Sequence, residues 1–305
     1  MTPGGDDRVA IGFVCTTERG GPQALEELGI DSLWVGGHVA STNPTPEVMV
    51  QLARLSALTS RVRIGTSILL LPLYPPAIIA KQIADLDVVS GGRITLGVGV
   101  GGEYPQEFRA CGIPVGERGS RADEAIPLLR RLWTGQPVTH HGRHFAMDDV
   151  RIHPAPAQPA GPPIIVSGRQ PVAMRRAALL GDGWMPYLYS PRRYAESVAR
   201  IREVAAEAGR SLDRFEWSAF VFVNVDADAA RARAAAAEFL GGTYRQDFDA
   251  FLDRVTATGT PSQVADRLGE YVTAGVRHLV LAIASRTDQR RVAETIAADV
   301  LPTLR

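Results

Sequence analysis

Short apolar runs with strand character alternate with segments of helical spacing along almost the whole sequence. The helical segments carry apolar residues three and four positions apart, as at Val48, Leu52, Leu55 and Leu58. Eight strand candidates, nearly all separated by helices within 305 residues, predict an α/β fold of the (β/α)8 or TIM barrel type. Their continuous apolar character is typical of parallel strands buried on both faces. The predicted strands span residues 9–15, 32–35, 62–71, 94–100, 163–166, 183–187, 216–225 and 277–284.

Helices are predicted between these strands and after the last one. Two connections, 134–162 and 240–260, are too long for plain loops, and we expect these insertions at the C-terminal face of the barrel to be functional or lid-like. Without a composition shift or an internal repeat, residues 1–305 are expected to form one domain. The predicted helices span 22–29, 46–59, 75–90, 117–133, 172–180, 194–208, an alanine-rich segment capped by Asp226 or Asp228, 261–274 and 288–299.

The charge balance and the cysteine content limit which binding partners and which cellular compartment are expected. Lys+Arg and Asp+Glu each number 33, so nothing favours nucleic acid or a membrane surface as the main partner. Cys15 and Cys111 lack disulfide or metal spacing and are expected to be reduced, buried thiols. Residues 1–8 lack the pattern of a signal peptide, and the longest apolar run, 64–71, is too short to span a bilayer. A cytoplasmic protein acting on a small molecule is therefore expected.

The residues that follow each strand are the candidates for chemistry, because active sites of such barrels lie at the C-terminal strand ends. Gly36, Gly37 and His38 follow the second strand. A histidine there is suited to donate or accept a proton near neutral pH, although it could equally cap a backbone group. Strand three contains Ser67 and Ile68 after a glycine and a threonine. Small residues inside an apolar strand indicate a bulge, a close approach of backbone to a ligand, or a small-residue layer of the barrel.

Strand four ends in a glycine run, 97–102, that contains the GxGxxG spacing of dinucleotide-binding loops. It follows the fourth strand rather than the first, Pro105 comes soon after it, and a clean helix is predicted only from Glu117. These features disfavour a Rossmann motif. We instead interpret the run as backbone that passes close to a flat ring, because glycine has no side chain to collide with it.

Two further polar segments invite a ligand. Ser167, Gly168 and Arg169 precede a helix, so backbone N–H groups, a hydroxyl and a guanidinium favour a phosphate site, with a capped turn as the alternative. The histidine-rich segment 139–144 matches no standard zinc pattern and is interpreted as a solvated turn, so no metal site is predicted. Paired arginines elsewhere are scattered and are expected to be solvated helix surface.

Several of these motifs together resemble the bacterial luciferase-like monooxygenase family, above all its branch that depends on the deazaflavin coenzyme F420. The resemblance extends from about residue 11 to residue 301. It implies a (β/α)8 barrel that binds the cofactor across its C-terminal mouth, with a non-proline cis peptide at Ser67–Ile68 forming a bulge behind the ring. It also implies a homodimer. The segments that carry it are SLWVGGH at 32–38, GTSIL at 65–69, PPAIIAK at 75–81, SGGRITLGVG at 90–99, GDGW at 181–184 and GTP at 259–261.

The resemblance assigns roles to individual residues. His38 matches the histidine that assists the chemistry, and is the predicted catalytic residue. The sequence departs from the family pattern at Gly37, where many deazaflavin members carry aspartate. It departs again at Gly102, where sugar-phosphate-oxidising members carry an acid, and this argues against a sugar phosphate as substrate. The predicted cofactor-binding residues are Gly37, Ser67, Ile68, Val100, Gly101, Glu103, Ser167, Gly168 and Arg169.

Three functions follow as hypotheses. The first is an F420-dependent oxidoreductase that transfers hydride between the deazaflavin and an alcohol or carbonyl, an imine or an activated alkene. The second is a two-component monooxygenase that uses FMN and O₂. The third, motivated by the missing carboxylate at Gly37, is a protein that binds a flavin or deazaflavin without catalysis.

Overall fold

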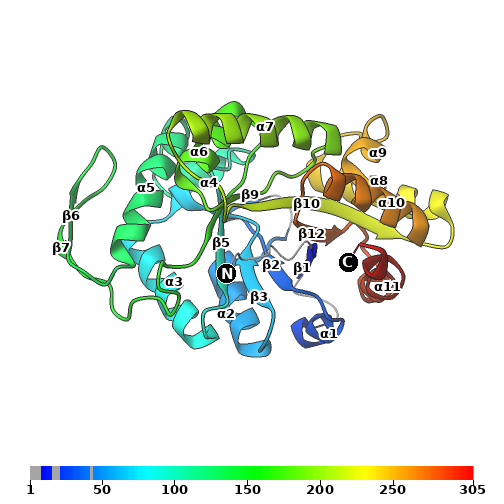
Figure 1. The fold of residues 1–305 in the computed structure, drawn as a ribbon, viewed down its shortest axis with the longest axis horizontal. Helices are drawn as coiled ribbons and strands as arrows, with labels where there is room; N and C mark the ends of the chain where they lie inside the picture. The colour runs from blue at the N-terminus through cyan, green and yellow to red at the C-terminus, as the bar shows by residue number, and fades with distance from the viewer. Residues whose placement is uncertain (1–7, 16–20, 42–43, 305) are drawn as a thin grey trace.

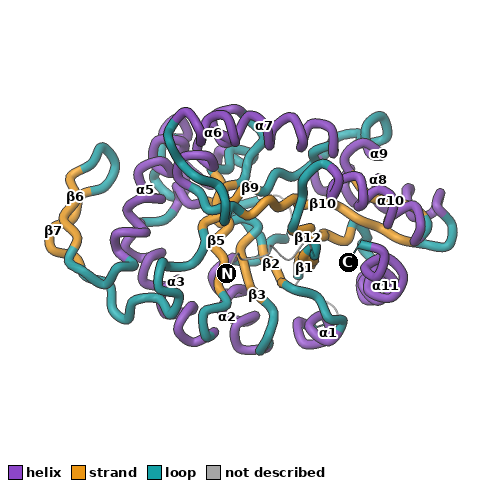
Figure 2. Tube along the Cα trace, in the orientation of Figure 1, coloured by secondary structure: helices purple, strands orange, loops and turns teal. Residues whose placement is uncertain are grey.

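The computed structural model describes residues 8–15, 21–41 and 44–304. Eight parallel strands close into a barrel because β9 pairs with β8 on one side and with β10 on the other. Strands occupy the interior and helices surround them (Figures 1 and 2). The predicted (β/α)8 barrel is confirmed. Its strands, in order around the barrel, are β1 (Ala10–Val14), β2 (Ser32–Val35), β3 (Arg63–Thr66), β5 (Ile94–Gly99), β8 (Ile164–Val166), β9 (Gly183–Trp184), β10 (Glu216–Val225) and β12 (His278–Ile283).

The helices follow the predicted segments closely, with caps where the sequence places them. Asp228 accepts backbone N–H bonds at the start of α8, Gly91 ends α3 in a left-handed conformation, and Thr260 and Gln263 form a capping box on α10. The main helices are α1 (Pro22–Glu27), α2 (Val48–Leu58), α3 (Pro76–Ser90), α5 (Arg118–Leu132), α6 (Pro171–Leu180), α7 (Pro191–Glu207), α8 (Ala229–Tyr244), α10 (Pro261–Thr273) and α11 (Gln289–Thr295).

Two predicted strands differ in the structure, and one helix is present that was not predicted. The strand at 62–71 is split into β3 and β4 (Leu69–Leu70), because the chain kinks at Ser67–Ile68. The sixth strand has only two residues, and Tyr187 reaches β10 through one isolated bridge to Phe220. A short helix, α4 (Pro105–Ala110), follows the glycine run at once, because proline fits the first turn of a helix. The expectation of no helix before Glu117 was therefore wrong.

The two insertions contain secondary structure of their own. Segment 134–162 holds an antiparallel hairpin, β6 (Val138–His141) and β7 (Ala146–Val150), which stands away from the barrel in Figure 1. In segment 240–260, α8 continues to Tyr244 and is followed by α9 (Leu252–Val255) and β11 (Thr256–Gly259). Strand β11 pairs with the C-terminal half of β10, beyond the part of β10 that pairs with β9.

The predicted solvated turn at 139–144 holds in part: His141 and Arg143 are exposed, whereas His140 and His144 pack against α5. His140 Nε2 lies 2.9 Å from Glu124 Oε1, and His144 Nε2 lies 2.8 Å from Ser120 Oγ. The side chain of His144 is only 4% exposed, because the hairpin folds back onto α5. Among the described residues, no three histidine, cysteine or acidic side chains are grouped closely enough to hold a metal ion.

The two cysteines differ in burial. No disulfide joins the described residues; Cys15 is buried and Cys111 is half-buried, so the prediction of two buried thiols holds for Cys15 alone. None of the helices in the described ranges has the length and apolar character needed to cross a membrane. The expectation of no signal peptide concerns residues 1–8. Of these, only residue 8 is among the described residues.

The barrel interior below the mouth is filled by one tryptophan and a polar network. Trp34 is fully buried, and its indole N–H donates to Ser32 Oγ at 2.8 Å. A Cβ on Gly65 of the neighbouring strand would lie 2.6 Å from the Trp34 ring, so glycine is required there. Trp34 packs with Ile165 and Met185, and Ile68 rests against this layer. The layer therefore forms the floor on which the mouth is built.

Candidate active site

The kink in strand three is a cis peptide bond between Ser67 and Ile68, as the family resemblance implies. The backbone N–H of Ser67 donates to Val35 O at 2.6 Å, and Thr66 Oγ1 donates to Gly97 O at 2.6 Å. Both neighbouring strands thus hold the kink in place. Within the described residues, the buried Oγ of Ser67 has no hydrogen-bond partner.

Two glycines of β5, the fourth predicted strand, leave room for the atoms of this kink. A Cβ on Gly99 would lie 1.9 Å from Cδ1 of Ile68, and one on Gly97 would lie 1.9 Å from Thr66 O. The sequence was interpreted as backbone that passes close to a bound ring. At these two positions the atoms that approach the glycine belong instead to the neighbouring strand. Gly101 differs, because its φ of +60° is a left-handed conformation that favours glycine whatever lies nearby.

The loop after β2 is equally tight. A Cβ on Gly36 would lie 2.5 Å from Ser67 O, and one on Gly37 would lie 2.0 Å from Pro46 O. The loop is therefore threaded between the kink and the chain that leads into α2. This contact gives a physical reason for glycine at position 37, since no residue with a side chain fits beside the Pro46 carbonyl.

His38 pairs with a glutamate that sequence reasoning missed. Nδ1 of His38 lies 3.3 Å from both carboxylate oxygens of Glu107, which is supplied by the short helix α4. The Glu107 side chain is fully buried, whereas that of His38 is 22% exposed. The ring of Tyr104 meets the His38 ring edge-on, with centroids 4.9 Å apart. A carboxylate oxygen accepts hydrogen bonds, so this pairing suits the tautomer that carries its proton on Nδ1, with Nε2 on the opposite side of the ring.

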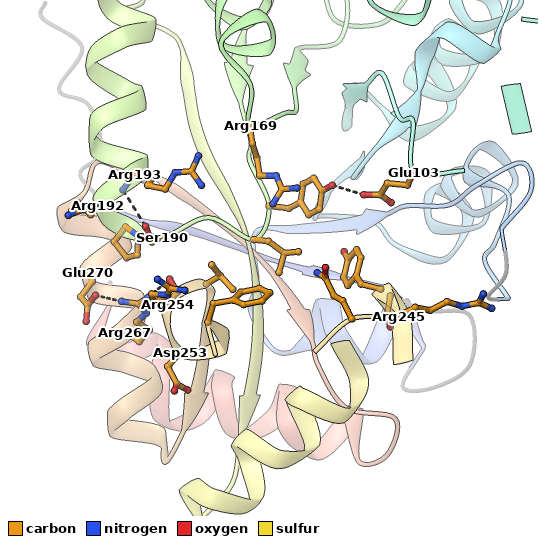
Figure 3. A pocket seen from close by; sticks show the side chains of 18 of the residues that line it. Glu103, Arg169, Ser190, Arg192, Arg193, Arg245, Asp253, Arg254, Arg267 and Glu270 are labelled. Atoms are coloured by element: carbon orange, nitrogen blue, oxygen red, sulfur yellow. Dashed lines mark hydrogen bonds and ion pairs between the residues drawn. The ribbon is translucent and has the colours of Figure 1, made fainter. Parts of the chain in front are cut away.

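A second polar group is formed by Glu103, Arg169 and Tyr187. The hydroxyl of Tyr187 donates to Glu103 Oε1 at 2.6 Å, and the Arg169 guanidinium lies 4.6 Å above the Tyr187 ring (Figure 3). Burial, with the charge of Glu103, raises the pKa of Tyr187 well above its usual value, so the phenol stays protonated and remains a donor. Glu103 and Arg169, both predicted cofactor ligands, are thus held by the same tyrosine.

A cavity of about 1330 Å³ opens beside this group. Of the predicted site residues, Glu103 and Arg169 line it, while Gly37 and His38 line a much smaller pocket next to Leu70 and Tyr74. The other six predicted residues line neither cavity. They follow or interrupt β3, β5 and β8 at the same end of the barrel: Ser67, Ile68, Val100, Gly101, Ser167 and Gly168.

The backbone near Gly168 is fixed by the barrel. Trp184 donates its indole N–H to Gly168 O at 2.9 Å, and a Cβ on Gly168 would lie 2.5 Å from that of Ala173. Ser167 is 8% exposed, and helix α6 begins at Pro171, close to the predicted start. The turn is therefore preformed, with its helix N-terminus facing the mouth.

These groups lie at the C-terminal strand ends of a (β/α)8 barrel, which is where enzymes with this fold have their active sites. Residues 22–278 match the family model described as luciferase-like monooxygenase, and the chain belongs to this family.

Similar proteins span the chain to different extents. An F420-dependent glucose-6-phosphate dehydrogenase of Amycolatopsis mediterranei is 28% identical, covering 97% of this chain and 98% of that protein. An uncharacterized protein of Mycobacterium tuberculosis is 38% identical over 55% of this chain, and the match spans only 57% of its length. Among solved structures, an F420-dependent secondary alcohol dehydrogenase in complex with an F420-acetone adduct superposes with a TM-score of 0.87. It is 23% identical and covers 98% of this chain and 99% of that chain, which supports the fold alone.

Proposed function

We propose that this protein is a coenzyme F420-dependent oxidoreductase that transfers hydride between the deazaflavin and a small organic substrate. The observation that carries the proposal is the pairing of His38 with the buried Glu107 at the mouth of the barrel. The full-length relative named for F420-dependent glucose-6-phosphate dehydrogenation supports F420 as the cofactor. The family itself supports redox chemistry.

The residues at the mouth fit a flat, hydrogen-bonding ring. The buried Ser67 Oγ has an unused hydrogen-bonding capacity among the described residues, which a ring heteroatom would satisfy. Ile68 presents an apolar side chain on a rigid floor, and Gly101 and Gly168 leave the rim without side chains. We propose that Ser67, Ile68, Val100, Gly101, Ser167 and Gly168 hold the ring system, with Gly37, Glu103 and Arg169 at its edges. When bound, the deazaflavin supplies or accepts the hydride.

The chain's own contribution to the chemistry is to manage the proton. With Nδ1 directed to Glu107, Nε2 of His38 is free to accept the hydroxyl proton of an alcohol as hydride leaves the adjacent carbon. In the reverse direction, the doubly protonated ring donates that proton to the carbonyl oxygen. Tyr104 limits rotation of the imidazole through its edge-on contact. Imines and activated alkenes require the same hydride and proton, so they remain within the proposed substrate class.

A cofactor titration tests the proposal directly. The purified protein is titrated with F420 and with FMN while fluorescence quenching is followed, and His38→Ala is compared with wild type. We expect F420 to bind, and His38→Ala to retain binding but to lose about 100-fold or more in turnover on a panel of alcohols, aldehydes and enones. His141→Ala is the matched control, because His141 is 65% exposed in the hairpin.

Each alternative hypothesis has its own outcome. Tight binding of FMN without binding of F420 would replace the proposal with the FMN monooxygenase. F420 binding without turnover on any of these substrates would favour the non-catalytic binding protein. Unchanged turnover of His38→Ala would reject the role of His38.

We further propose that the chain acts as one barrel domain, in the cytoplasm and as a homodimer. The continuous sheet of described strands other than the β6–β7 hairpin supports a single domain. Apolar side chains on α2 and α3 that are 41–73% exposed support a partner surface there: Val50, Ile78, Val88 and Val89. Light scattering tests the dimer, and a monomer at micromolar concentration would reject it.

A further inference from the structure

A line of hydrogen bonds runs inside the barrel at the end opposite the mouth. His278 stands between two partners, because its Nε2 lies 2.7 Å from Ser32 Oγ and its Nδ1 lies 2.9 Å from Glu216 Oε1. Arg63 donates to the other oxygen of Glu216 at 2.9 Å. These groups are the first residues of four barrel strands, β2, β3, β10 and β12: Ser32, Arg63, Glu216 and His278.

A serine, a histidine and a carboxylate bonded in this order have the pattern of a hydrolase triad. Here the serine cannot reach a substrate, because Ser32 is fully buried and His278 is only 2% exposed. A Cβ on Gly12 of β1 would lie 2.1 Å from Ser32 Oγ, so the neighbouring backbone already covers the hydroxyl. The line therefore has a role inside the protein rather than in nucleophilic catalysis.

The hydrogen bonds continue from Ser32 to Trp34. The indole N–H of Trp34, which can only donate, lies 2.8 Å from Ser32 Oγ. The Ser32 hydroxyl can then give its own hydrogen to Nε2 of His278, while Nδ1 of His278 gives its hydrogen to Glu216. In this arrangement every donor of the line has an acceptor, as buried polar groups require. The bonds thus tie the single polar atom of the Trp34 ring to the N-terminal end of the barrel.

Glycines on two neighbouring strands keep the Trp34 ring in one place. A Cβ on Gly12 would lie 2.8 Å from Nε1 of the ring, and one on Gly65 would lie 2.6 Å from Cζ3. The backbones of β1 and β3 therefore enclose opposite ends of the indole. Trp34 also belongs to the apolar layer on which Ile68 rests. Because a close-packed interior has little free volume, a shift of Trp34 is passed on to Ile68.

We propose that Ser32 is a positioning residue for the ring site, the group of mouth residues around Ile68 proposed above to hold the deazaflavin. Through its bond to Trp34, Ser32 fixes the floor beneath Ile68. His278 and Glu216 in turn fix the direction of the Ser32 hydroxyl. This role rests on the proposed function, because it makes cofactor affinity depend on groups at the far end of the barrel that do not touch the cofactor.

The test compares Ser32→Ala with Ser218→Ala in the full chain. Ser218 is the matched control, because it is as deeply buried as Ser32 and donates to the same Glu216 oxygen at 3.0 Å, but lies outside the line to Trp34. The NMR signal of the Ile68 Cδ1 methyl group, assigned with Ile68→Val, is measured without cofactor, and F420 affinity is measured by fluorescence. We expect Ser32→Ala to shift the methyl signal and to lower F420 affinity about tenfold, and Ser218→Ala to change neither.

A protein without the indole N–H shows whether the effect passes through Trp34. Trp34→Phe keeps an aromatic ring but has no N–H group to bond Ser32. In that background, Ser32→Ala should lower F420 affinity by less than about twofold, because two residues that act through one contact are not additive. Ser32→Cys replaces Ser32→Ala if the alanine variant does not fold, since a thiol forms only weak hydrogen bonds.

Each result has a defined meaning. The positioning role is overturned if Ser32→Ala leaves the Ile68 methyl signal or the F420 affinity unchanged. It is also overturned if Ser218→Ala has an equal effect, which would indicate a general loss of stability, or if the full effect persists in the Trp34→Phe background. If the wild type does not bind F420 while the methyl signal still responds to Ser32→Ala alone, the proposed function is rejected and the link from Ser32 to Ile68 is retained.

Discussion

Nδ1 of His38 lies 3.3 Å from both carboxylate oxygens of Glu107, although 69 positions separate the two residues in the sequence. The Glu107 carboxylate on α4 is fully buried, whereas the His38 side chain is 22% exposed. Such a pairing fixes the tautomer of the histidine and the direction of its second nitrogen. Glu107 is thus a positioning residue whose effect on the chemistry passes through His38.

Glu107→Gln should slow turnover while leaving the cofactor site intact. The amide has the same shape, but its NH₂ group can face Nδ1, so the imidazole loses a fixed tautomer. We expect kcat to fall about tenfold or more with F420 affinity unchanged, measured by steady-state kinetics and fluorescence titration. Glu203→Gln, 57% exposed on α7, is the control. Equal kcat values for Glu107→Gln and wild type would contradict the positioning role.

Gly99→Ala should damage the kink that supports the ring site. The new methyl group would lie 1.9 Å from Cδ1 of Ile68, so the side chain or the strand must move. We expect a loss of about 1–3 kcal/mol in the free energy of unfolding, measured in urea, and weaker F420 binding. Gly116→Ala is the control, because nothing lies within 4 Å of a Cβ there.

A second substitution separates this clash from a general effect of the strand. Ile68→Ala removes the colliding atom, so the Gly99→Ala, Ile68→Ala double variant should be more stable than the sum of the two single effects predicts. Strict additivity in the same urea experiment would show that Gly99 is needed for another reason.

The sequence resembles a family in which many F420-dependent members carry aspartate at the position of Gly37. Gly37→Asp should nevertheless raise neither the stability nor the F420 affinity of this protein. A Cβ at position 37 would lie 2.0 Å from the Pro46 carbonyl, so the loop must shift. We expect the melting temperature to fall and F420 affinity to decrease, measured by calorimetry and fluorescence. Val39→Asp, at a side chain that is 50% exposed, should be tolerated. A Gly37→Asp variant as stable as wild type and binding F420 more tightly would contradict this account.

Local sequence signals were sufficient to predict the barrel, but not to predict which side chains pair at its mouth. Continuous apolar runs reveal parallel strands, and glycine or proline marks the helix ends, because both effects act within a few residues. Glu107 was missed because its helix has only six residues, and the sequence predicted a clean helix only from Glu117. The contact that makes Glu107 important is with a residue on another strand end, and no local pattern encodes it.

The large cavity beside Glu103 and Arg169 shows the same limit. Arg193 lies in a helix start that carries two adjacent arginines, and by itself that pattern indicates solvated surface. Its place over Tyr189, on the wall of the same cavity as Arg254 and Arg267, depends on how helices that are distant in the sequence pack together. Likewise, the glycines of strand four pointed to a close approach, but only the structure shows that at Gly99 the approaching atom belongs to Ile68.

At the opposite end of the barrel from the mouth, Glu216 closes a polar network. It accepts hydrogen bonds from Nδ1 of His278 at 2.9 Å, from Arg63 at 2.9 Å and from Ser218 Oγ at 3.0 Å. Burial alone would raise the pKa of Glu216, but the bond from His278 and the charge of Arg63 outweigh it and hold that pKa well below its usual range. The carboxylate therefore stays ionised to lower pH in the folded state than in the unfolded chain.

This difference in the pKa of Glu216 predicts acid sensitivity. Stability from a carboxylate with a depressed folded pKa is fully present above its unfolded pKa of about 4.3 and is lost as the pH falls toward the folded value. Glu216→Gln should therefore unfold more easily at pH 7, by about 3 kcal/mol, because it leaves Arg63 without its charge partner and His278 without its carboxylate acceptor. The variant should also lose less stability than wild type between pH 5 and pH 3, in urea titrations at each pH. Glu196→Gln, at a carboxylate that is 64% exposed on α7, should follow wild type throughout. Parallel pH dependences of Glu216→Gln and wild type would mean that other carboxylates control acid unfolding.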